Sequence, residues 1–241
     1  MRKILSHTRR AVDDYNMIES GDRIAVGVSG GKDSLVLLCA MHALKRFYPN
    51  EFHLEALTLD MGAPDMDFSG VKKLCEELDI PYTVLKTDIY EVIFKHRKEK
   101  SPCSLCAKMR RGGLNDLAKS RGLSKVCLGH HFDDVIETFF LSLFYEGRIN
   151  CFSPVTYLDR SDITVIRPFI YLPEKEIKRY TKAENLPVVK NTCPADGNTK
   201  RQEVKELIRK LEYDNHGLKE RVFTALKTSN VQGWNISEGE I

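Results

Sequence analysis

The sequence lacks the features that mark several special classes of protein. No stretch approaches the roughly 18 consecutive apolar residues of a membrane-spanning helix, and charges interrupt the apolar residues of the N-terminal segment, unlike in a signal or transit peptide. Neither sign of charge dominates, because 37 Lys and Arg face 34 Asp and Glu, a net charge of +3 that permits a nucleic-acid partner without requiring one. With 42% hydrophobic and 29% charged residues, the chain is typical of a globular protein, and we expect it in the cytoplasm.

The cysteines do not suit a disulfide scaffold either. There are seven of them, an odd number at irregular spacings. In the cytoplasm thiols stay reduced, so each cysteine is expected to be core filling, a metal ligand or a reactive group. Cys39, Cys75 and Cys127 fall on apolar stretches and are interpreted as core residues.

Strand and helix patterns alternate along the chain. Short apolar segments predict strands at residues 23–28, 54–59, 82–86, 125–128 and 164–167, with helices at 35–47, 68–78, 104–120, 134–144 and 174–184. This alternation predicts an α/β fold, a mostly parallel sheet with helices on both faces, whose ligands bind beyond the carboxyl ends of the strands. We expect a domain over residues 1–186 and a small C-terminal appendage over 187–241, with helices at 200–211 and 218–227 and a poorly ordered tail after residue 229.

A glycine-containing loop follows the first predicted strand and opens a helix. It reads SGGKDS and comprises Ser29, Gly30, Gly31, Lys32, Asp33 and Ser34. Two glycines let a backbone approach an anion, and a helix N-terminus offers unpaired N–H groups. The loop matches neither the Walker pattern nor G-x-G-x-x-G. It is interpreted as a phosphate-binding loop, with an ordinary turn at a helix start as the alternative.

Cys103 and Cys106 form a C-x-x-C pair at a predicted helix start, with Ser101 as the expected N-cap and Pro102 as the first helical residue. Residues three apart share a helix face, so both sulfurs could bind one metal, zinc or an iron–sulfur cluster. Two incidental cysteines or a redox pair are the alternatives. The chain has no second C-x-x-C, so we expect the loop residue Cys193 as the third ligand, with Cys151 in reserve.

The sequence GHHFDD follows the fourth predicted strand, at the same edge of the sheet as the phosphate loop. Asp133 or Asp134, together with Glu137, has the spacing of a helix cap. His130 and His131 are not expected to share a zinc ion, because adjacent residues of a strand face opposite sides.

Basic residues surround the cysteine pair. Residues 95–111 contain seven Lys or Arg and one Glu. Their position beside a candidate active site favours contact with the phosphate backbone of tRNA, with an ordinary solvated face as the alternative. The C-terminal helices also carry Lys200, Arg201 and Lys205, but interleaved glutamates make a solvated face an equal alternative there.

These motifs together resemble a known family. SGGKDS is similar to the PP-loop of ATP pyrophosphatases, and its combination with CSLCAKMRRGGL, LGHHFDD and Ile166-Arg167-Pro168 resembles the tRNA 2-thiocytidine biosynthesis family over residues 1–225. The resemblance implies ATP-dependent thiolation of cytidine 32 in the tRNA anticodon loop. Adenylation of the base precedes transfer of sulfur at a [4Fe-4S] cluster, which the resemblance assigns to Cys103, Cys106 and Cys193.

The resemblance also implies roles for individual residues. ATP would be bound by the six loop residues and by Leu59, Asp60, Gly129 and His130. Asp134 would act in acid–base or Mg²⁺ chemistry, Lys32 would stabilise phosphate charge, and Arg110 would orient the nucleotide or the base. The residues expected to bind tRNA are Lys95, Arg97, Lys98, Lys100, Lys108 and Arg111.

Several alternatives stay open. TCP around Cys193 also resembles the 2-thiouridine enzymes, and Phe132 follows GHH where the thiocytidine family is expected to have Arg. A PP-loop ligase of the lysidine-synthetase type would make no use of the three cysteines. A metal-cluster sensor that binds nucleotide without turnover is the alternative from another class. The expected partners are tRNA and a sulfur donor, either a cysteine desulfurase or sulfide, and a homodimer is compatible with the sequence.

Overall fold

A parallel-dominated sheet forms the centre of the computed structural model. Within residues 1–97, 102–190, 192–193, 199–229 and 231–234, which the structure describes, six strands pair in the order β3-β2-β1-β4-β6-β5. The strands are β1 (Asp22–Gly27), β2 (Phe52–Asp60), β3 (Tyr82–Lys86), β4 (Lys125–Cys127), β5 (Val155–Leu158) and β6 (Ile163–Ile166). All neighbours are parallel except β5, which runs antiparallel to β6 at one edge. The predicted fold class is confirmed.

The order of the strands places a crevice beside β1. From β1 the chain first builds outward through β2 and β3, and then crosses to the other side of β1 with β4 and β6. Because the chain leaves β1 on one side and β4 on the other, an opening remains beyond the carboxyl ends of these two neighbouring strands. Ligands bind at such openings in sheets of this kind. The phosphate loop follows β1 and GHHFDD follows β4, so both predicted motifs lie at this opening.

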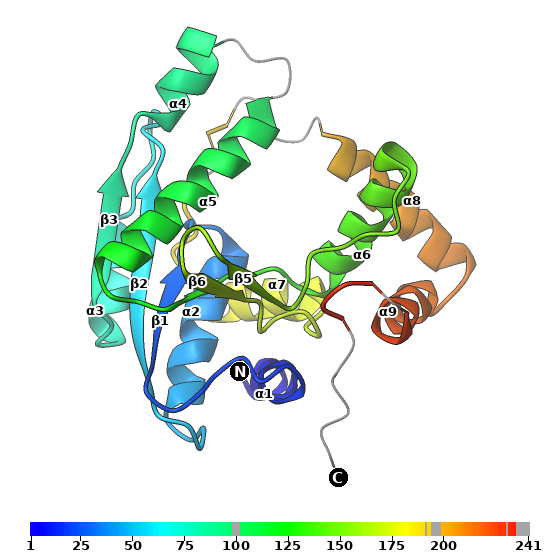
Figure 1. Ribbon diagram of the computed structural model, residues 1–241, viewed down its shortest axis with the longest axis horizontal. Helices are drawn as coiled ribbons and strands as arrows, with labels where there is room; N and C mark the ends of the chain where they lie inside the picture. The colour runs from blue at the N-terminus through cyan, green and yellow to red at the C-terminus, as the bar shows by residue number, and fades with distance from the viewer. Residues whose placement is uncertain (98–101, 191, 194–198, 230, 235–241) are drawn as a thin grey trace.

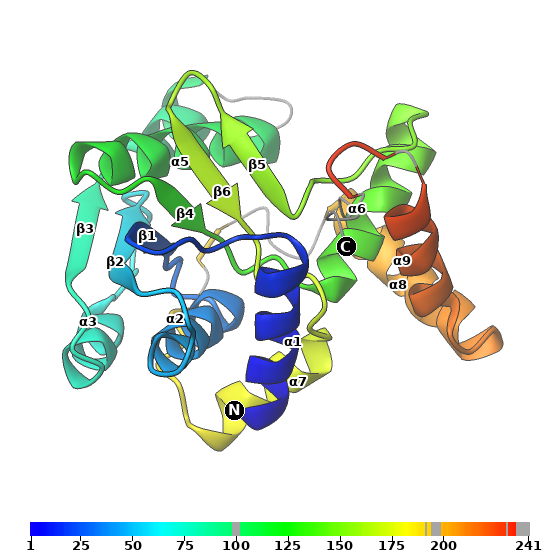
Figure 2. The ribbon, with the colours of Figure 1, turned by 60° about the horizontal axis from the view of Figure 1, so that its bottom comes forward.

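Helices cover both faces of the sheet (Figures 1 and 2). One face packs against α5 (Pro102–Ser120) through a small buried cluster that includes Leu57, Ala118 and Val126. The other face carries the larger core. The helices on that side are α1 (Arg2–Asp14), α2 (Lys32–Lys45), α3 (Ser69–Glu77) and α7 (Glu174–Ala183). A short helix, α4 (Ile89–Glu91), continues into the π-helical turn η1 (Val92–Arg97) ahead of α5.

A group of helices stands to one side of the sheet. It comprises α6 (Phe132–Leu141), the π-helical turn η2 (Ser142–Glu146), α8 (Lys200–Asp214) and α9 (Leu218–Thr228) (Figure 1). The two predicted C-terminal helices are therefore confirmed. Val204 and Ile208 of α8, with Phe223 and Leu226 of α9, belong to the same buried cluster as the main core. In the described part of the chain, no helix is both long enough and apolar enough to cross a membrane.

Three elements depart from the sequence predictions. The charged N-terminal segment forms the amphipathic helix α1, whose Ile4, Ala11 and Val12 are buried. The edge strand β5 was not predicted. The expectation of a poorly ordered tail is wrong for residues 231–234, because Trp234 is fully buried and its indole N–H donates to the carbonyl of Phe152 at 3.1 Å. One large aromatic side chain is enough to anchor a polar segment to the core.

Candidate functional site

The phosphate loop is held in shape by its two serines. The Ser34 hydroxyl donates to the carbonyl of Gly31 at 2.8 Å, and it accepts from the backbone N–H of Ser29 at 3.2 Å. α2 begins at Lys32, with Gly31 as its N-cap, and no side chain caps this helix start. Backbone N–H groups at the first turn therefore stay available to an anion, and the helix dipole favours a negative charge there.

Two glycines allow neighbouring segments to approach the loop closely. Gly30 has a φ of +83°, and a Cβ at this position would lie 2.6 Å from a methyl group of Val189. The backbone N–H of Val189 donates to the carbonyl of Gly30 at 2.9 Å, which fixes the segment leading to Cys193 against the loop. A Cβ on Gly129 would meet the backbone of Asp33 at 3.1 Å. The GHHFDD segment thus packs directly on the start of α2.

Lys32 is anchored by two carboxylates. Its Nζ lies 3.0 Å from Oδ2 of Asp33 and 3.1 Å from Oε1 of Glu174 in α7. Burial acts to lower the pKa of Lys32, but these two carboxylates outweigh it and the pKa is raised. The ammonium is therefore charged and fixed at the mouth of the loop. Oδ1 of Asp33 is buried and has no hydrogen-bond partner within the described residues.

The start of α6 is closed by a capping box that differs from the predicted one. Nδ1 of His131 accepts from the backbone N–H of Asp134 at 3.4 Å, and the Asp134 carboxylate accepts from the backbone N–H of His131 at 3.0 Å. The prediction that Glu137 pairs with Asp133 or Asp134 in the cap is wrong, since the helix begins at Phe132 and His131 is its N-cap. Glu137 lies one turn further on and is buried.

His130 and Arg167 lie on the same aromatic ring beyond the ends of β4 and β6. The Phe152 ring centroid is 4.9 Å from that of His130 and 5.2 Å from the Arg167 guanidinium carbon. Burial, together with the charge of Arg167, lowers the pKa of His130 to about 4, so its imidazole is neutral at physiological pH. Nδ1 of His130 is buried with no partner in the described part of the chain. Burial also lowers the pKa of Arg167, to about 10.

Basic residues of α8 and α9 reach the acidic side chains beside the loop. Arg201 lies 3.4 Å from Asp134 and 3.2 Å from Glu137. Lys205 lies 3.1 Å from Glu174, and Lys219 lies 2.6 Å from Asp133.

Arg201 and Lys205 of α8 therefore form ion pairs with acidic side chains, although the Arg201 side chain is still 44% exposed. Their i,i+4 spacing was the available signal, since it places both side chains on one face of a helix. Burial raises the pKa of Glu137, although Lys205 and Arg201 act against it.

The structure places two of the predicted cysteine ligands, Cys103 and Cys106, in the first turns of α5. Sγ of Cys106 lies 3.5 Å from Sδ of Met61, the residue that follows β2, so α5 carries the pair to the carboxyl edge of the sheet. Burial raises the pKa of the Cys106 thiol; the charge of Arg110 lowers it, whereas Cys193 and Cys103 act in the same direction as burial.

The other four cysteines are buried. The thiol of Cys151 lies 3.5 Å from the carbonyl of Val135. Cys39, Cys75 and Cys127 are buried, as predicted for core residues. Pro102 is the first residue of α5, as predicted, whereas Ser101 lies outside the described residues.

The donor groups predicted around Cys106 are thiols, which bind zinc as well as iron–sulfur clusters in proteins. No group of three His, Cys, Asp or Glu among the described residues is placed to hold one metal ion. Cys103 is exposed and Cys106 is half-buried, so a group bound here would stay open to substrate on one side.

Two further predicted nucleotide contacts lie beside the cysteines. Leu59 and Asp60 end β2, and Leu59 faces α5 so closely that a Cβ on Gly113 would lie 2.5 Å from its methyl group. One Asp60 carboxylate oxygen accepts from the backbone N–H of Gly62 at 2.9 Å. The end of β2 thus lies between the phosphate loop and the cysteine pair.

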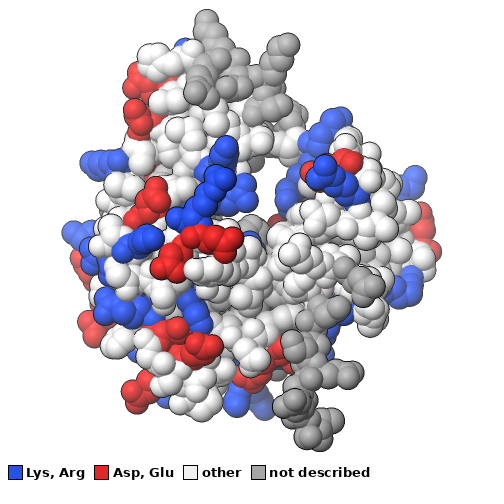
Figure 3. Space-filling view, viewed as in Figure 1, with Lys and Arg blue, Asp and Glu red and all other residues white. Residues whose placement is uncertain are grey.

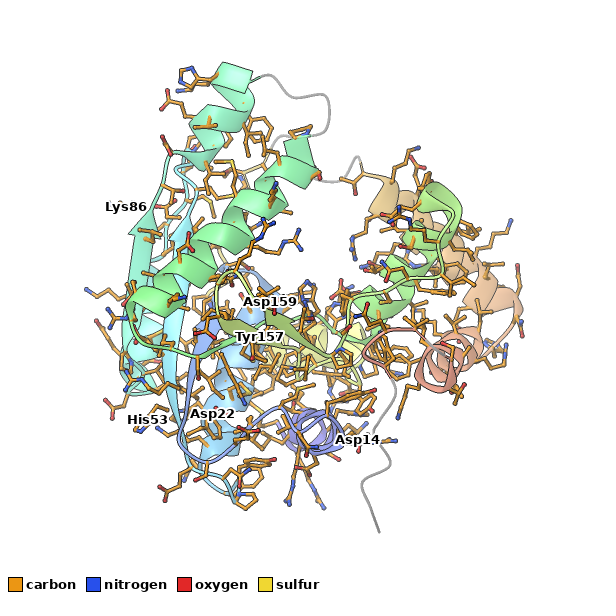
Figure 4. The ribbon with its side chains drawn as sticks, in the orientation of Figure 1. Asp14, Asp22, His53, Lys86, Tyr157 and Asp159 are labelled. Carbon is orange, nitrogen blue, oxygen red and sulfur yellow. The ribbon has the colours of Figure 1, made fainter. Side chains whose placement is uncertain are left out.

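Of the basic residues predicted around the cysteine pair, those whose side chains the structure describes lie mostly on α5. Lys108, Arg110 and Arg111 are exposed, as is Lys95, which lies 3.5 Å from Glu91. Lys98 and Lys100 lie outside the described residues, and for Arg97 the structure describes the backbone alone. Figure 3 shows Lys and Arg side chains on both sides of the hollow between α5 and the helices α6 and α8. Figure 4 shows side chains from both walls projecting toward it, whereas the labelled His53 and Asp14 lie at the far end of the molecule.

Comparison with known proteins gives a consistent set of relatives. A family model described as a PP-loop domain matches residues 4–211. The chain is 40% identical over 243 aligned residues to a tRNA-cytidine(32) 2-sulfurtransferase of Geobacter metallireducens, covering 100% of this chain and 94% of the relative. It is 37% identical over 228 residues to the protein of the same description from Teredinibacter turnerae, covering 94% and 76%.

Among solved structures, the chain is similar to the U34-tRNA thiolase NcsA from Methanococcus maripaludis, which was solved with its [4Fe-4S] cluster. The TM-score is 0.72 at 24% identity, with 90% of this chain and 75% of that chain covered. At this level of identity the likeness is one of fold.

Proposed function

The chain belongs to the tRNA 2-thiocytidine biosynthesis family of PP-loop proteins, and from this premise we propose that it is an ATP-dependent tRNA sulfurtransferase acting on cytidine 32 of the anticodon loop. The observation that supports the proposal is that the C-x-x-C pair and the phosphate loop lie at the same edge of the sheet. Cys106 contacts Met61 just beyond β2, while the segment that leads to Cys193 is bonded to Gly30 of the loop.

The phosphate loop is assigned to ATP. Its free N–H groups and the fixed Lys32 ammonium would hold the β- and γ-phosphates and stabilise the charge that develops as pyrophosphate leaves. In this step O2 of the cytosine forms a bond to the α-phosphorus, and the bond to pyrophosphate breaks. Asp134 is the carboxylate assigned to Mg²⁺ or to proton transfer, since carboxylate oxygen is the donor that Mg²⁺ prefers. Arg201, which now neutralises Asp134, would have to give up this contact.

The thiols are assigned to a [4Fe-4S] cluster. Cys103, Cys106 and Cys193 would hold three of its irons, and the fourth would stay open to sulfur; when bound, the cluster supplies sulfide to the activated base. Arg110, whose positive charge lowers the pKa of the Cys106 thiol, would hold the negative charge of the thiolate or of AMP as it departs. The exposed Lys108 and Arg111 would bind the RNA backbone.

The first test follows AMP release and tRNA thiolation by protein purified without oxygen, with ATP, Mg²⁺, sulfide and tRNA present. Thiolation that is lost in Cys103→Ser and kept in Ser104→Ala, an exposed neighbour, supports the proposal. A fully active Cys103→Ser variant would instead favour a ligase of the lysidine-synthetase type. Absence of AMP formation with all components present would favour a nucleotide-binding sensor.

A further inference from the structure

An exposed apolar patch lies on the segment that follows α6. Leu143 is 38% exposed, Phe144 49%, Tyr145 51% and Ile149 71%. Together with Arg148 and Lys200 we call these residues the η2 patch. Large apolar side chains gathered on one surface usually mark a site of interaction. The proposed chemistry assigns no role to any of them.

The patch is held outward by a defined backbone rather than by a loose loop. The Ser142 hydroxyl donates to the Glu146 carboxylate at 2.9 Å, and the backbone N–H of Arg148 donates to the carbonyl of Ser142 at 3.1 Å. Gly147 ends the turn in the left-handed conformation, with φ of 63°. The Phe144 ring lies 5.3 Å from that of Phe140 in α6. The exposed rings are therefore preorganised, and binding a partner costs little conformational entropy.

Arg148 and Lys200 add cations to the patch, where Glu146 and Glu203 supply carboxylates. Nζ of Lys200 lies 5.4 Å above the ring of Tyr145, whose hydroxyl donates to Glu203 at 2.9 Å. Glu203 is in turn paired with Lys200 at 2.9 Å. Arg148 is exposed beside the apolar side chains. Aromatic rings combined with cations are the features by which proteins bind single-stranded nucleic acid, since bases stack on the rings while the cations meet the phosphates.

The patch is connected to the proposed active site. Lys200 precedes Arg201, which lies 3.4 Å from Asp134, and the same helix α8 begins a few residues after Cys193. η2 and the N-terminal part of α5 stand on opposite sides of the hollow between them (Figures 1 and 3). The hollow is thus bordered by η2, which has exposed rings, and by α5, which has the exposed Lys108, Arg110 and Arg111.

We infer that the η2 patch is a stacking platform for unpaired nucleotides of an RNA loop, which it holds while the neighbouring base enters the site. The inference rests on the proposed function, because it takes the RNA to be the tRNA whose base is modified. A base that is modified within a loop has to be splayed out, and the nucleotides beside it lose their stacking partners in the process. Phe144 and Tyr145 would replace those partners, and Arg148 would meet the backbone.

The test compares three variants in binding to an anticodon stem-loop hairpin and to a fully paired RNA duplex, across a range of salt concentrations. Phe144→Ala should weaken hairpin binding roughly tenfold, leave duplex binding unchanged and keep the salt dependence of the wild type. Arg148→Ala should reduce the slope of log K against log salt by about one. Tyr213→Ala, which removes an 80% exposed ring near the far end of α8, should change neither.

Hairpin binding by Phe144→Ala within twofold of the wild type would overturn the inference, as would an equal loss on hairpin and duplex. A wild-type dimer that Phe144→Ala dissociates without loss of hairpin affinity would also overturn it, and would assign the patch to a second copy of the chain. If Phe144→Ala fails to fold, Tyr145→Ala removes the other exposed ring and is held to the same outcomes. Hairpin binding is measured without turnover, so the patch can fail while tRNA is still thiolated, and thiolation can fail while the patch still binds.

Discussion

Glu174 is the residue whose replacement gives the most quantitative prediction. Its carboxylate lies within 3.1 Å of Lys32, Lys178 and Lys205, and the side chain is only 11% exposed. Burial acts to raise the pKa of Glu174, but hydrogen bonds from Lys178, Lys205 and Lys32 outweigh it and lower the pKa from 4.5 to about 2. At 1.36 kcal/mol per pKa unit, the ionised carboxylate stabilises the folded state by about 3 kcal/mol.

Glu174→Gln removes this charge while keeping the shape of the side chain. We expect the free energy of unfolding to fall by about 2–3 kcal/mol at pH 7, because Lys32 and Lys205 lose a carboxylate in a poorly solvated place. The folded-state pKa lies below the unfolded one, so the stabilisation is complete above about pH 5 and is lost as the pH falls from about 4.5 towards 2. The difference between wild type and variant should therefore be constant from pH 7 to 5 and shrink below that.

Urea unfolding followed by circular dichroism between pH 7 and pH 3 measures this difference. Glu203→Gln is the control, since its carboxylate is also paired with a lysine but is 58% exposed, and its removal should leave the midpoint close to that of the wild type. A loss below 1 kcal/mol for Glu174→Gln at pH 7, or a loss that stays the same at pH 3, would refute the reasoning.

Three other replacements test separate parts of the site and fold. Lys32→Met should lower the rate of AMP formation by about 100-fold with the fold intact by circular dichroism, because it removes the cation fixed at the phosphate loop; a loss below tenfold would contradict this role. Cys193→Ser should abolish the visible absorbance and the iron content of anaerobically purified protein. Cys151→Ser, which replaces a buried thiol, should keep both. The reverse pattern would identify Cys151 as the third ligand. Trp234→Ala should reduce the free energy of unfolding by about 3–5 kcal/mol in urea titrations, since a fully buried indole is lost; a change under 1 kcal/mol would show that the segment does not anchor the core.

The sequence was sufficient for the sheet and for the placement of its motifs. Strands buried on both faces of a parallel sheet read as short apolar runs, so the predicted strand at residues 23–28 lies within one residue of β1. Because the carboxyl ends of parallel strands lie at the same edge of a sheet, the phosphate loop, GHHFDD and the end of β2 were expected at that edge. The edge strand β5 has only half-buried and exposed residues, and such a strand carries no strong apolar signal.

The ion pairs of the site and the cap of α6 could not be predicted from the sequence. Arg201 and Lys205 alternate with Glu203 and Glu206, a pattern that solvated helices share. Only the fold reveals that these two side chains turn toward Asp134, Glu137 and Glu174. His131 as an N-cap was missed for a related reason, because histidine is an uncommon cap and the adjacent aspartates fit the usual pattern. Contacts of this kind depend on tertiary packing, which local spacing does not encode.

The central claim is that this chain thiolates a cytidine of tRNA. The most direct measurement is mass analysis of nucleosides from unmodified tRNA that has been incubated with the iron-loaded protein, ATP, Mg²⁺ and sulfide, with a parallel reaction lacking ATP. The account predicts 2-thiocytidine at position 32, formed only when ATP is present. A thiolated uridine, a lysine-modified cytidine, or no sulfur-containing nucleoside in a reaction that releases AMP would contradict it.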